Sequence, residues 1–222
     1  DPFERRLGLF PVSFDTKGRM KVHTRFGDYP MQVPQRKFDP EPEASMGWNL
    51  LSYGKACSAS SELEGHEAVL AGDENVRTWW SAASGEAGEW FGMDLGRPMR
   101  IEAVQLNFAE QDVDTTRMAE DYTAYRLLAS LDGEHWETVV DESRNRTPNP
   151  HCFVDFKRSI TARYLRAVNV KAMLQGKFAI RDLRVFGHGL AEAPARVERV
   201  VARRNREDER FAHVEWMPSA GA

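Results

Sequence analysis

The sequence predicts an all-β domain, an antiparallel sandwich built from several short strands. Residues 104–108 alternate apolar and polar side chains, which is the pattern of a strand with one buried face. Residues 125–130 and 136–140 form two further strand-like runs, separated by an Asp-Gly turn at 132–133. Because no helical period extends beyond about one turn, the pattern favours a sandwich over alternating strands and helices.

Further strands are expected at intervals along the middle of the chain. They are predicted at 90–95, 153–156, 164–170 and 180–186. Glycine or proline lies near most of the joints between them, which is typical of turns. Three tryptophans, Trp80, Trp90 and Trp136, are expected to close the ends of the sandwich, because each indole can bury a large apolar area.

Composition divides the 222 residues into three parts. Four prolines between Pro30 and Pro42 predict an extended linker, and strand alternation stops again at 187–194. We therefore predict a tail and linker at 1–45, a complete domain at 46–188 and the beginning of another at 189–222. Within the tail, the residues around 15–18 predict a hairpin turn.

Charge and cysteine usage narrow the function classes. The net charge of −4 has the wrong sign for a general binder of nucleic-acid backbones. No run approaches the roughly 18 apolar residues that a membrane-spanning helix requires. Cys57 and Cys152 match no zinc-binding spacing, and we expect buried free thiols rather than a disulfide.

Six motifs follow one another in the middle segment. They lie at 49–60, 73–81, 89–96, 130–136, 161–166 and 180–187. In this order and spacing they resemble the discoidin, or coagulation factor 5/8 type C, domain over about residues 47–188. The resemblance implies an eight-stranded jelly-roll sandwich whose ligand sites lie in loops at one end.

The loop at 73–78 offers carboxylate, amide, hydroxyl and carbonyl oxygens within six residues. Ca²⁺ takes roughly six to eight oxygen ligands, and in the resembling family a structural calcium often lies here. The resemblance implies a set of ligands that comprises Asp73, Thr78, carbonyls near Ala71 and Asn75, and Asp182. The family more often has Glu at the last position, so Asp182 reaches less far. The alternative is that Asp73 caps its own loop amides without a metal.

The domain is also similar to family 32 carbohydrate-binding modules, which implies a non-catalytic module that binds polysaccharide. Sugar binding uses an aromatic face with hydrogen-bonding side chains beside it. Candidate loops lie at 62–66, 110–121 and 174–178, together with the tryptophan pair at 79–80. The candidate ligand-binding residues are His66, Trp79, Arg117 and Phe178. For His66 the alternative is a surface histidine, and for Trp79 it is a second core tryptophan.

Other function classes remain open at this point. A structural or protein-interaction spacer that packs against a catalytic domain fits the same fold. Membrane-lipid binding requires exposed apolar side chains beside basic residues, which the acidic middle segment does not offer. Carboxylates gather at 112–121, but we interpret them as a solvated loop and not as a glycosidase pair. This segment is therefore not expected to be an enzyme.

The flanking segments carry two shorter resemblances. Residues 3–30 resemble the last strands of a glycoside hydrolase family 43 propeller, and residues 193–218 resemble the first two strands of a fibronectin type III domain. Together they imply a bacterial multidomain glycoside hydrolase. An upstream catalytic domain would then be a partner in the same chain, and the location would be extracellular or periplasmic.

Overall fold

The computed structural model describes residues 10–24, 29–31, 33, 35–36, 46–190, 199–204 and 212–217. The chain separates into two compact units, Asp1–Gly189 and Leu190–Ala222. Among the described residues of the second unit, β11 (Arg199–Arg204) pairs with β12 (Ala212–Met217) in an antiparallel hairpin. The first unit carries the candidate site.

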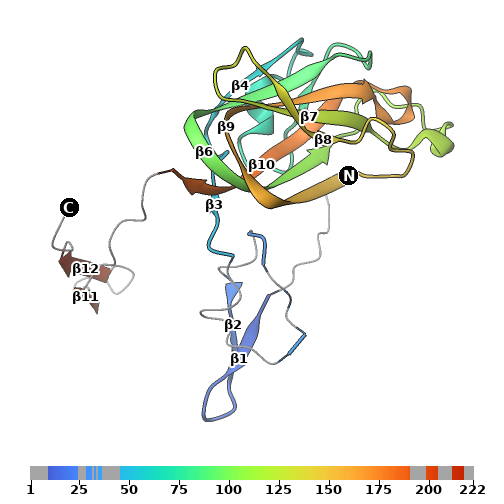
Figure 1. The fold of residues 1–222 in the computed structure, drawn as a ribbon. Coiled ribbons are helices and arrows are strands. Elements are labelled where there is room, and N and C mark those ends of the chain that lie inside the picture. The colour runs from blue at the N-terminus through green and yellow to red at the C-terminus, as the bar shows by residue number, and fades with distance from the viewer. Residues whose placement is uncertain are drawn as a thin grey trace. The chain divides into compact units, whose positions relative to one another are not determined.

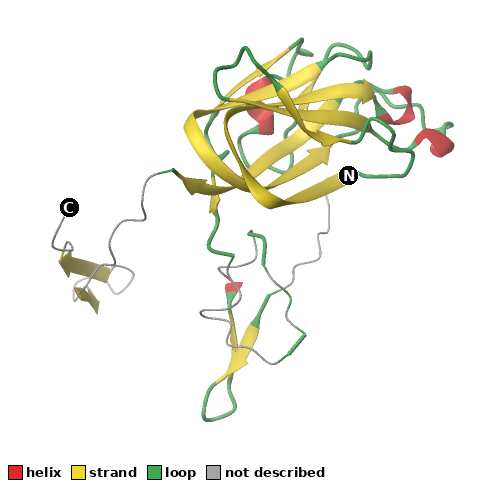
Figure 2. Cartoon of the chain, in the orientation of Figure 1, coloured by secondary structure: helices red, strands yellow, loops and turns green. Residues whose placement is uncertain are grey.

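Strands form the framework of the first unit, and helical turns lie in its connecting loops (Figures 1 and 2). The strands are β1 (Val12–Phe14), β2 (Met20–Val22), β3 (Asn49–Leu50), β4 (Ala56–Ala59), β5 (Trp80–Ser81), β6 (Trp90–Phe108), β7 (Ala124–Ser130), β8 (Glu137–Asp141), β9 (His151–Lys171) and β10 (Ala179–Gly189). The 3-10 turns are η2 (Ala68–Ala71), η3 (Met118–Glu120) and η4 (Met173–Gln175). The all-β prediction is confirmed, and no α-helix occurs among the described residues.

Eight strands form one antiparallel sheet that folds over itself into a jelly-roll sandwich. The order is β3-β10-β6-β9-β7-β8, with β4 on β6 and β5 on β10. The strands β6 and β9 are long because each one serves both layers, and their ribbons curve around the module in Figure 1. The segment 90–94 of β6 pairs with β4 and with residues 164–168 of β9, whereas 99–107 pairs with β10 and with residues 151–162.

The strands predicted at 90–95 and 104–108 are therefore the two halves of one bent strand, and those at 153–156 and 164–170 are the two halves of β9. The pairing of β6 with β9 shifts register between Asp94 and Met99. Gly96 lies within this shift at a φ of 85°, a conformation that side chains with a Cβ rarely adopt. The predicted hairpin of β7 and β8 is confirmed.

Aromatic rings fill the core between the layers. Trp80 is fully buried, and its ring centroid lies 5.5 Å from that of Phe91 and 5.7 Å from that of Phe178. Its Nε1 donates a hydrogen bond to the carbonyl oxygen of Ser61 (3.1 Å), so the indole is buried without leaving its donor unpaired. Burial of such a side chain contributes about 1.5–3 kcal/mol, and the prediction for Trp80 is confirmed.

The expected core packing is wrong for Trp90 and Trp136, which are half-buried and enclose Arg166. The guanidinium Cζ lies 4.0 Å from the ring centroid of Trp90 and 4.1 Å from that of Trp136. Burial lowers the pKa of Arg166, and its Nε has no hydrogen-bond partner in the structure as described. The two π faces therefore stabilise a cation that lacks a full set of acceptors.

The N-terminal hairpin forms where the sequence predicts it. The strands β1 and β2 pair with Val12 opposite Val22, and Asp15 accepts hydrogen bonds from the backbone N–H groups of Lys17 and Arg19. Apolar side chains on both strands and just before β1 are exposed. They are Phe10, Val12, Phe14, Met20 and Val22.

The two cysteines are free thiols in the structure, and both are half-buried rather than fully buried as the sequence suggests. Burial, together with the negative charge of Asp73, raises the pKa of the Cys57 thiol to about 11. Burial also raises the pKa of Cys152. Neither thiol is therefore an activated nucleophile.

Candidate functional site

Trp79 is the centre of an aromatic and polar cluster at one end of the sandwich. The His66 ring stacks on it with 4.5 Å between ring centroids and an interplanar angle of 28°, and the Arg181 guanidinium lies 5.5 Å from its centroid. Its Nε1 donates to Oε1 of Gln111 (3.0 Å). Trp79 is half-buried, so it is not a second core tryptophan.

Four loops meet beside this cluster, and we call them together the loop end: residues 61–67, 84–89, 110–121 and 171–178. Backbone hydrogen bonds join three of them, from Lys177 N to Gln111 O (2.9 Å), from Asp114 N to Leu174 O (2.9 Å) and from Phe178 N to Ser84 O (3.1 Å). The loop at 61–67 is joined to 84–89 by the hydrogen bond from Ser61 Oγ to Glu89. The three candidate loops are thus neighbours in space. The sequence analysis did not include the fourth, 84–89.

An ion pair between Asp112 and Lys177 lies next to Gln111. Lys177 Nζ is 2.5 Å from Asp112 Oδ2, and Gln111 Nε2 donates to Oδ1 of the same carboxylate (3.0 Å). The ammonium of Lys177 holds the pKa of Asp112 below its usual range. Asp112 is thus a charged acceptor that adjoins the ring cluster through Gln111.

Two predicted ligand-binding residues do not join the ring cluster. Phe178 is only 1% exposed and packs edge-on against Trp80 in the core, so its ring cannot face a ligand and the prediction for it is wrong. Arg117 lies in the loop end, but it pairs with Asp114 (3.2 Å) and Glu120 (2.9 Å) of its own loop. Those two carboxylates, rather than Trp79, hold its guanidinium.

Glu89 ties two of the loops together through serine hydroxyls. Ser61 Oγ and Ser84 Oγ each lie 2.7 Å from one of its carboxylate oxygens, and Ser60 Oγ also donates to it. Burial alone would raise the pKa of Glu89, but the hydroxyl donors outweigh it and the pKa is lowered. The carboxylate therefore stays charged and fixes the loop at 84–89.

Asn169, on β9, holds the loop at 84–89 through its side-chain amide. Its Nδ2 donates to the carbonyl oxygens of Gly85 (2.8 Å) and Glu86 (2.9 Å), and the side chain is 1% exposed. Its Oδ1 is a buried acceptor without a partner among the described residues, which is the kind of site an ordered water satisfies. Neither Glu89 nor Asn169 stands out in the sequence, because most of their partners are distant in the chain.

The predicted metal-binding residues fall into two groups. Thr78 Oγ1 lies 2.8 Å from Asp73 Oδ2 and 2.9 Å from the carbonyl oxygen of Asn75, so three oxygens converge in the loop. Asp182 lies on β10, where its Oδ1 accepts a hydrogen bond from Asn107 Nδ2 (2.5 Å). Carboxylate, hydroxyl and carbonyl oxygens are the kinds of ligand that Ca²⁺ takes.

Side chains alone do not form a metal site in the part of the chain that the structure describes, because no three His, Cys, Asp or Glu side chains cluster there. Two arginine side chains of β10 already connect this strand to the loop at 73–78. Arg184 Nε lies 3.0 Å from Glu74 Oε2, and Arg181 Nη1 donates to the carbonyl oxygen of Val76 (2.5 Å). The loop therefore has a direct attachment to the last strand.

The acidic surplus of residues 46–188 is concentrated at the loop end. This range carries 21 acidic and 16 basic side chains, of which the four loops hold ten acidic and three basic. The acidic residues of the loop end are Glu62, Glu64, Glu67, Glu86, Glu89, Glu110, Asp112, Asp114, Glu120 and Asp121. The remainder of the range has a small basic surplus, so the negative potential is local to this end.

A family model described as the F5/8 type C domain matches residues 55–182. Among solved structures, chitosan-binding module 1 of a chitosanase/glucanase from Paenibacillus sp. IK-5 is 23% identical, with a TM-score of 0.53 over 63% of this chain and 99% of that one. Module 2 of the same enzyme, in complex with chitotriose, is 25% identical with a TM-score of 0.51, over 62% and 99% of the two chains.

The family 32 carbohydrate-binding module of C. perfringens NanJ, in complex with galactose, is 18% identical with a TM-score of 0.52. The match covers 63% of this chain and 98% of that module. At this identity the likeness shows the fold, which agrees with the jelly-roll topology of the sheet. No helix among the described residues has the length and apolar character to cross a membrane.

Proposed function

Because the chain belongs to the F5/8 type C domain family, we propose that residues 46–188 form a non-catalytic accessory module that binds carbohydrate at the loop end. The observation that carries the proposal is the stack of His66 on Trp79, with Gln111 hydrogen-bonded to the indole N–H. Aromatic surface beside fixed donors and acceptors is the chemistry that recognises a pyranose, which has one apolar face and a polar edge.

The cluster presents imidazole and guanidinium groups beside the indole rather than one bare indole face, because His66 stacks on Trp79 and Arg181 lies 5.5 Å from its ring centroid. Hydrogen bonds from the imidazole, the guanidinium and the Asp112–Lys177 pair therefore contribute much of the recognition. The serine network of Glu89 and the hydrogen bonds of Asn169 keep the neighbouring loop in place. Such preorganisation lowers the cost of ordering the site when ligand binds.

The local charge selects the kind of glycan. Ten acidic and three basic side chains at the loop end repel uronic acids and other anionic sugars, and they favour neutral or cationic ones. Two of the similar structures are named as chitosan-binding modules and a third holds galactose, which supports a neutral or amino sugar as ligand.

The proposal is tested by a glycan array, followed by titrations of the protein with soluble oligosaccharides. The array should include arabinose-, xylose-, galactose- and glucosamine-containing chains together with uronate-rich ones. Saturable binding to neutral or amino sugars is expected. Absence of binding to every glycan would contradict carbohydrate binding and favour a spacer that packs against another domain.

We also propose a structural calcium ion at the loop 73–78. Asp73, Thr78 and the carbonyl of Asn75 would hold it, with the carbonyl of Ala71 and Asp182 as further ligands. The support is that two further loop oxygens, Asp73 Oδ2 and the carbonyl oxygen of Asn75, lie 2.8 and 2.9 Å from Thr78 Oγ1. Bound Ca²⁺ would neutralise the carboxylates and stiffen the loop. The contacts of Arg184 with Glu74 and of Arg181 with Val76 would keep the loop against β10.

The flanking segments support a larger parent protein as a further part of the proposal. Exposed apolar side chains on both strands of the N-terminal hairpin are those expected of a segment that packs on a neighbouring domain, such as the propeller of a family 43 glycoside hydrolase. The hairpin of β11 and β12 exposes Val200 and Trp216, as the first strands of a fibronectin type III domain would. A polysaccharide-degrading parent would act in the periplasm or outside the cell.

A further inference from the structure

A cavity lies far from the loop end, where β7 turns into β8. The strand β7 runs from Ala124, which pairs with Lys171 of the loop end, to Ser130 at the cavity. Six residue steps of about 3.3 Å place the cavity about 20 Å away along the strand. Its volume is about 540 Å³, which is within the range of small-ligand sites.

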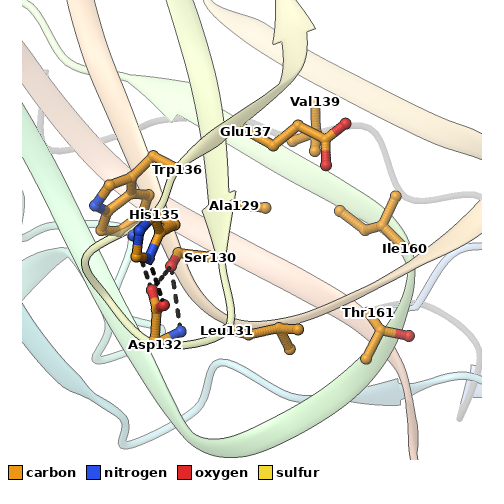
Figure 3. Close-up of a pocket in the computed structure, with 10 residues that line it drawn as sticks. All are labelled: Ala129, Ser130, Leu131, Asp132, His135, Trp136, Glu137, Val139, Ile160 and Thr161. Atoms are coloured by element: carbon orange, nitrogen blue, oxygen red, sulfur yellow. Dashed lines mark hydrogen bonds and ion pairs between the residues drawn. The ribbon is translucent and has the colours of Figure 1, made fainter.

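Apolar side chains form part of the cavity wall. Leu131 is 56% exposed at the turn, and Ile160 of β9 faces the turn from the other side of the opening (Figure 3). Trp136 lines the cavity, and the Arg166 guanidinium lies against its ring. The indole Nε1 of Trp136 donates a hydrogen bond to the carbonyl oxygen of Gly133 (3.0 Å). The indole is therefore held in one orientation.

The polar part of the wall is acidic and incompletely paired. The Glu137 carboxylate is exposed and makes no hydrogen bond or ion pair with another described residue. His135 Nδ1 lies 2.8 Å from Asp132 Oδ2, which orients the ring. The ten lining residues include two carboxylates, Asp132 and Glu137, and no lysine or arginine. The cavity therefore favours a cation or a neutral polyol and repels an anion.

We propose that this cavity is a second carbohydrate subsite that takes an amino sugar. The C–H face of the sugar packs on Leu131 and Trp136, and its ammonium group pairs with Glu137. The inference rests on the proposed carbohydrate binding of the module, but it concerns a separate site. Two sites on one rigid module let it hold a polysaccharide at two points, which raises the overall affinity without new contacts at either one.

The test uses the indole N–H signals of Trp79 and Trp136 as separate reporters in ¹H–¹⁵N spectra of the whole chain, assigned with Trp79→Phe and Trp136→Phe. The probes are a glucosamine trisaccharide and its fully N-acetylated counterpart. We expect the glucosamine trisaccharide to shift the Trp136 signal with saturation. Glu137→Gln should weaken this binding about tenfold, because it removes a charged hydrogen-bond acceptor.

Glu134→Gln is the matched control, since Glu134 is an exposed glutamate of the same turn that does not line the cavity, and it should leave the Trp136 titration unchanged. A Trp79 shift without a Trp136 shift would overturn the inference and leave the proposed function intact. Equal Trp136 shifts with both probes, or equal weakening by Glu137→Gln and Glu134→Gln, would overturn the amino-sugar assignment. Silence at both indoles would contradict the inference and the proposed function together.

Discussion

Gly85 and Gly176 approach each other so closely that a Cβ on Gly85 would lie 2.0 Å from the carbonyl oxygen of Gly176. This contact joins two loops that are distant in the sequence and fixes the spacing of the loop end. Neither glycine has a positive φ, so the reason for glycine is space rather than backbone conformation.

Gly85→Ala should therefore destabilise the module by about 1–3 kcal/mol, the usual cost of overpacking, because a backbone carbonyl must move. Gly189→Ala is the control, since the nearest atom to a Cβ there is a side-chain nitrogen of Arg97 at 3.7 Å. Urea unfolding measures both variants. Equal stability of Gly85→Ala and the wild type would show that the two loops can separate without cost.

Glu89→Gln should change how stability depends on pH. The folded-state pKa of Glu89 is below its ordinary value of 4.5, so its carboxylate stabilises the fold above that pH and the contribution is lost as the pH falls through the folded pKa. The gap in melting temperature between wild type and variant should be widest near neutral pH and narrow below about pH 4.5.

Glu86→Gln is the control for this experiment, because the Glu86 side chain is exposed in the same loop and its carboxylate bonds to no other described residue. A gap between wild type and Glu89→Gln that stays constant from about pH 3 to 7 would contradict the assigned role of the serine hydroxyls.

Arg166→Lys should destabilise the fold, because an ammonium cannot lie flat between two indoles as a guanidinium does. Loss of two cation–π contacts corresponds to about 1–2 kcal/mol. Arg158→Lys, on an exposed position of the same strand, should be neutral. Chemical denaturation of both variants measures the difference, and an equal effect of the two substitutions would argue against the stacked arrangement.

A chelator should lower the melting temperature of the wild type if calcium holds the loop 73–78, and added Ca²⁺ should restore it. A ligand present at 100 times its Kd stabilises a fold by about 2.7 kcal/mol. Asp73→Asn should remove the response to the chelator. A wild-type melting temperature that does not change with chelator would leave the Glu74–Arg184 ion pair as the attachment of this loop.

Alternation and turn chemistry predicted the segments of β6 to β10, because each of these strands buries one face. The short strands β3, β4 and β5 were not predicted. The continuity of β6 could not be predicted in this way, since Gly96 and Pro98 look like a strand end and instead mark a bend from one layer to the other. Trp90 and Trp136 were misjudged for a related reason. Hydrophobicity does not reveal that Arg166, from a different strand, lies between them.

The candidate site was predicted in part. The loops that carry His66 and Trp79 were identified from their residue types, whereas Gln111 and Arg181 complete the cluster only through the fold. Phe178 was chosen for its aromatic ring in a predicted loop, but hydrophobic burial directs that ring into the core. A single sequence does not distinguish these two fates of a phenylalanine near a strand end.

The central claim, carbohydrate binding at the loop end, is tested most directly by titration calorimetry with the oligosaccharide that the array selects. Trp79→Ala removes the ring on which His66 and Arg181 rest, and Tyr53→Ala removes a 66% exposed aromatic outside the four loops. We predict that Trp79→Ala raises the Kd about tenfold or more, equivalent to about 1.4 kcal/mol, while Tyr53→Ala does not change it. Unchanged affinity of a folded Trp79→Ala variant would contradict the account.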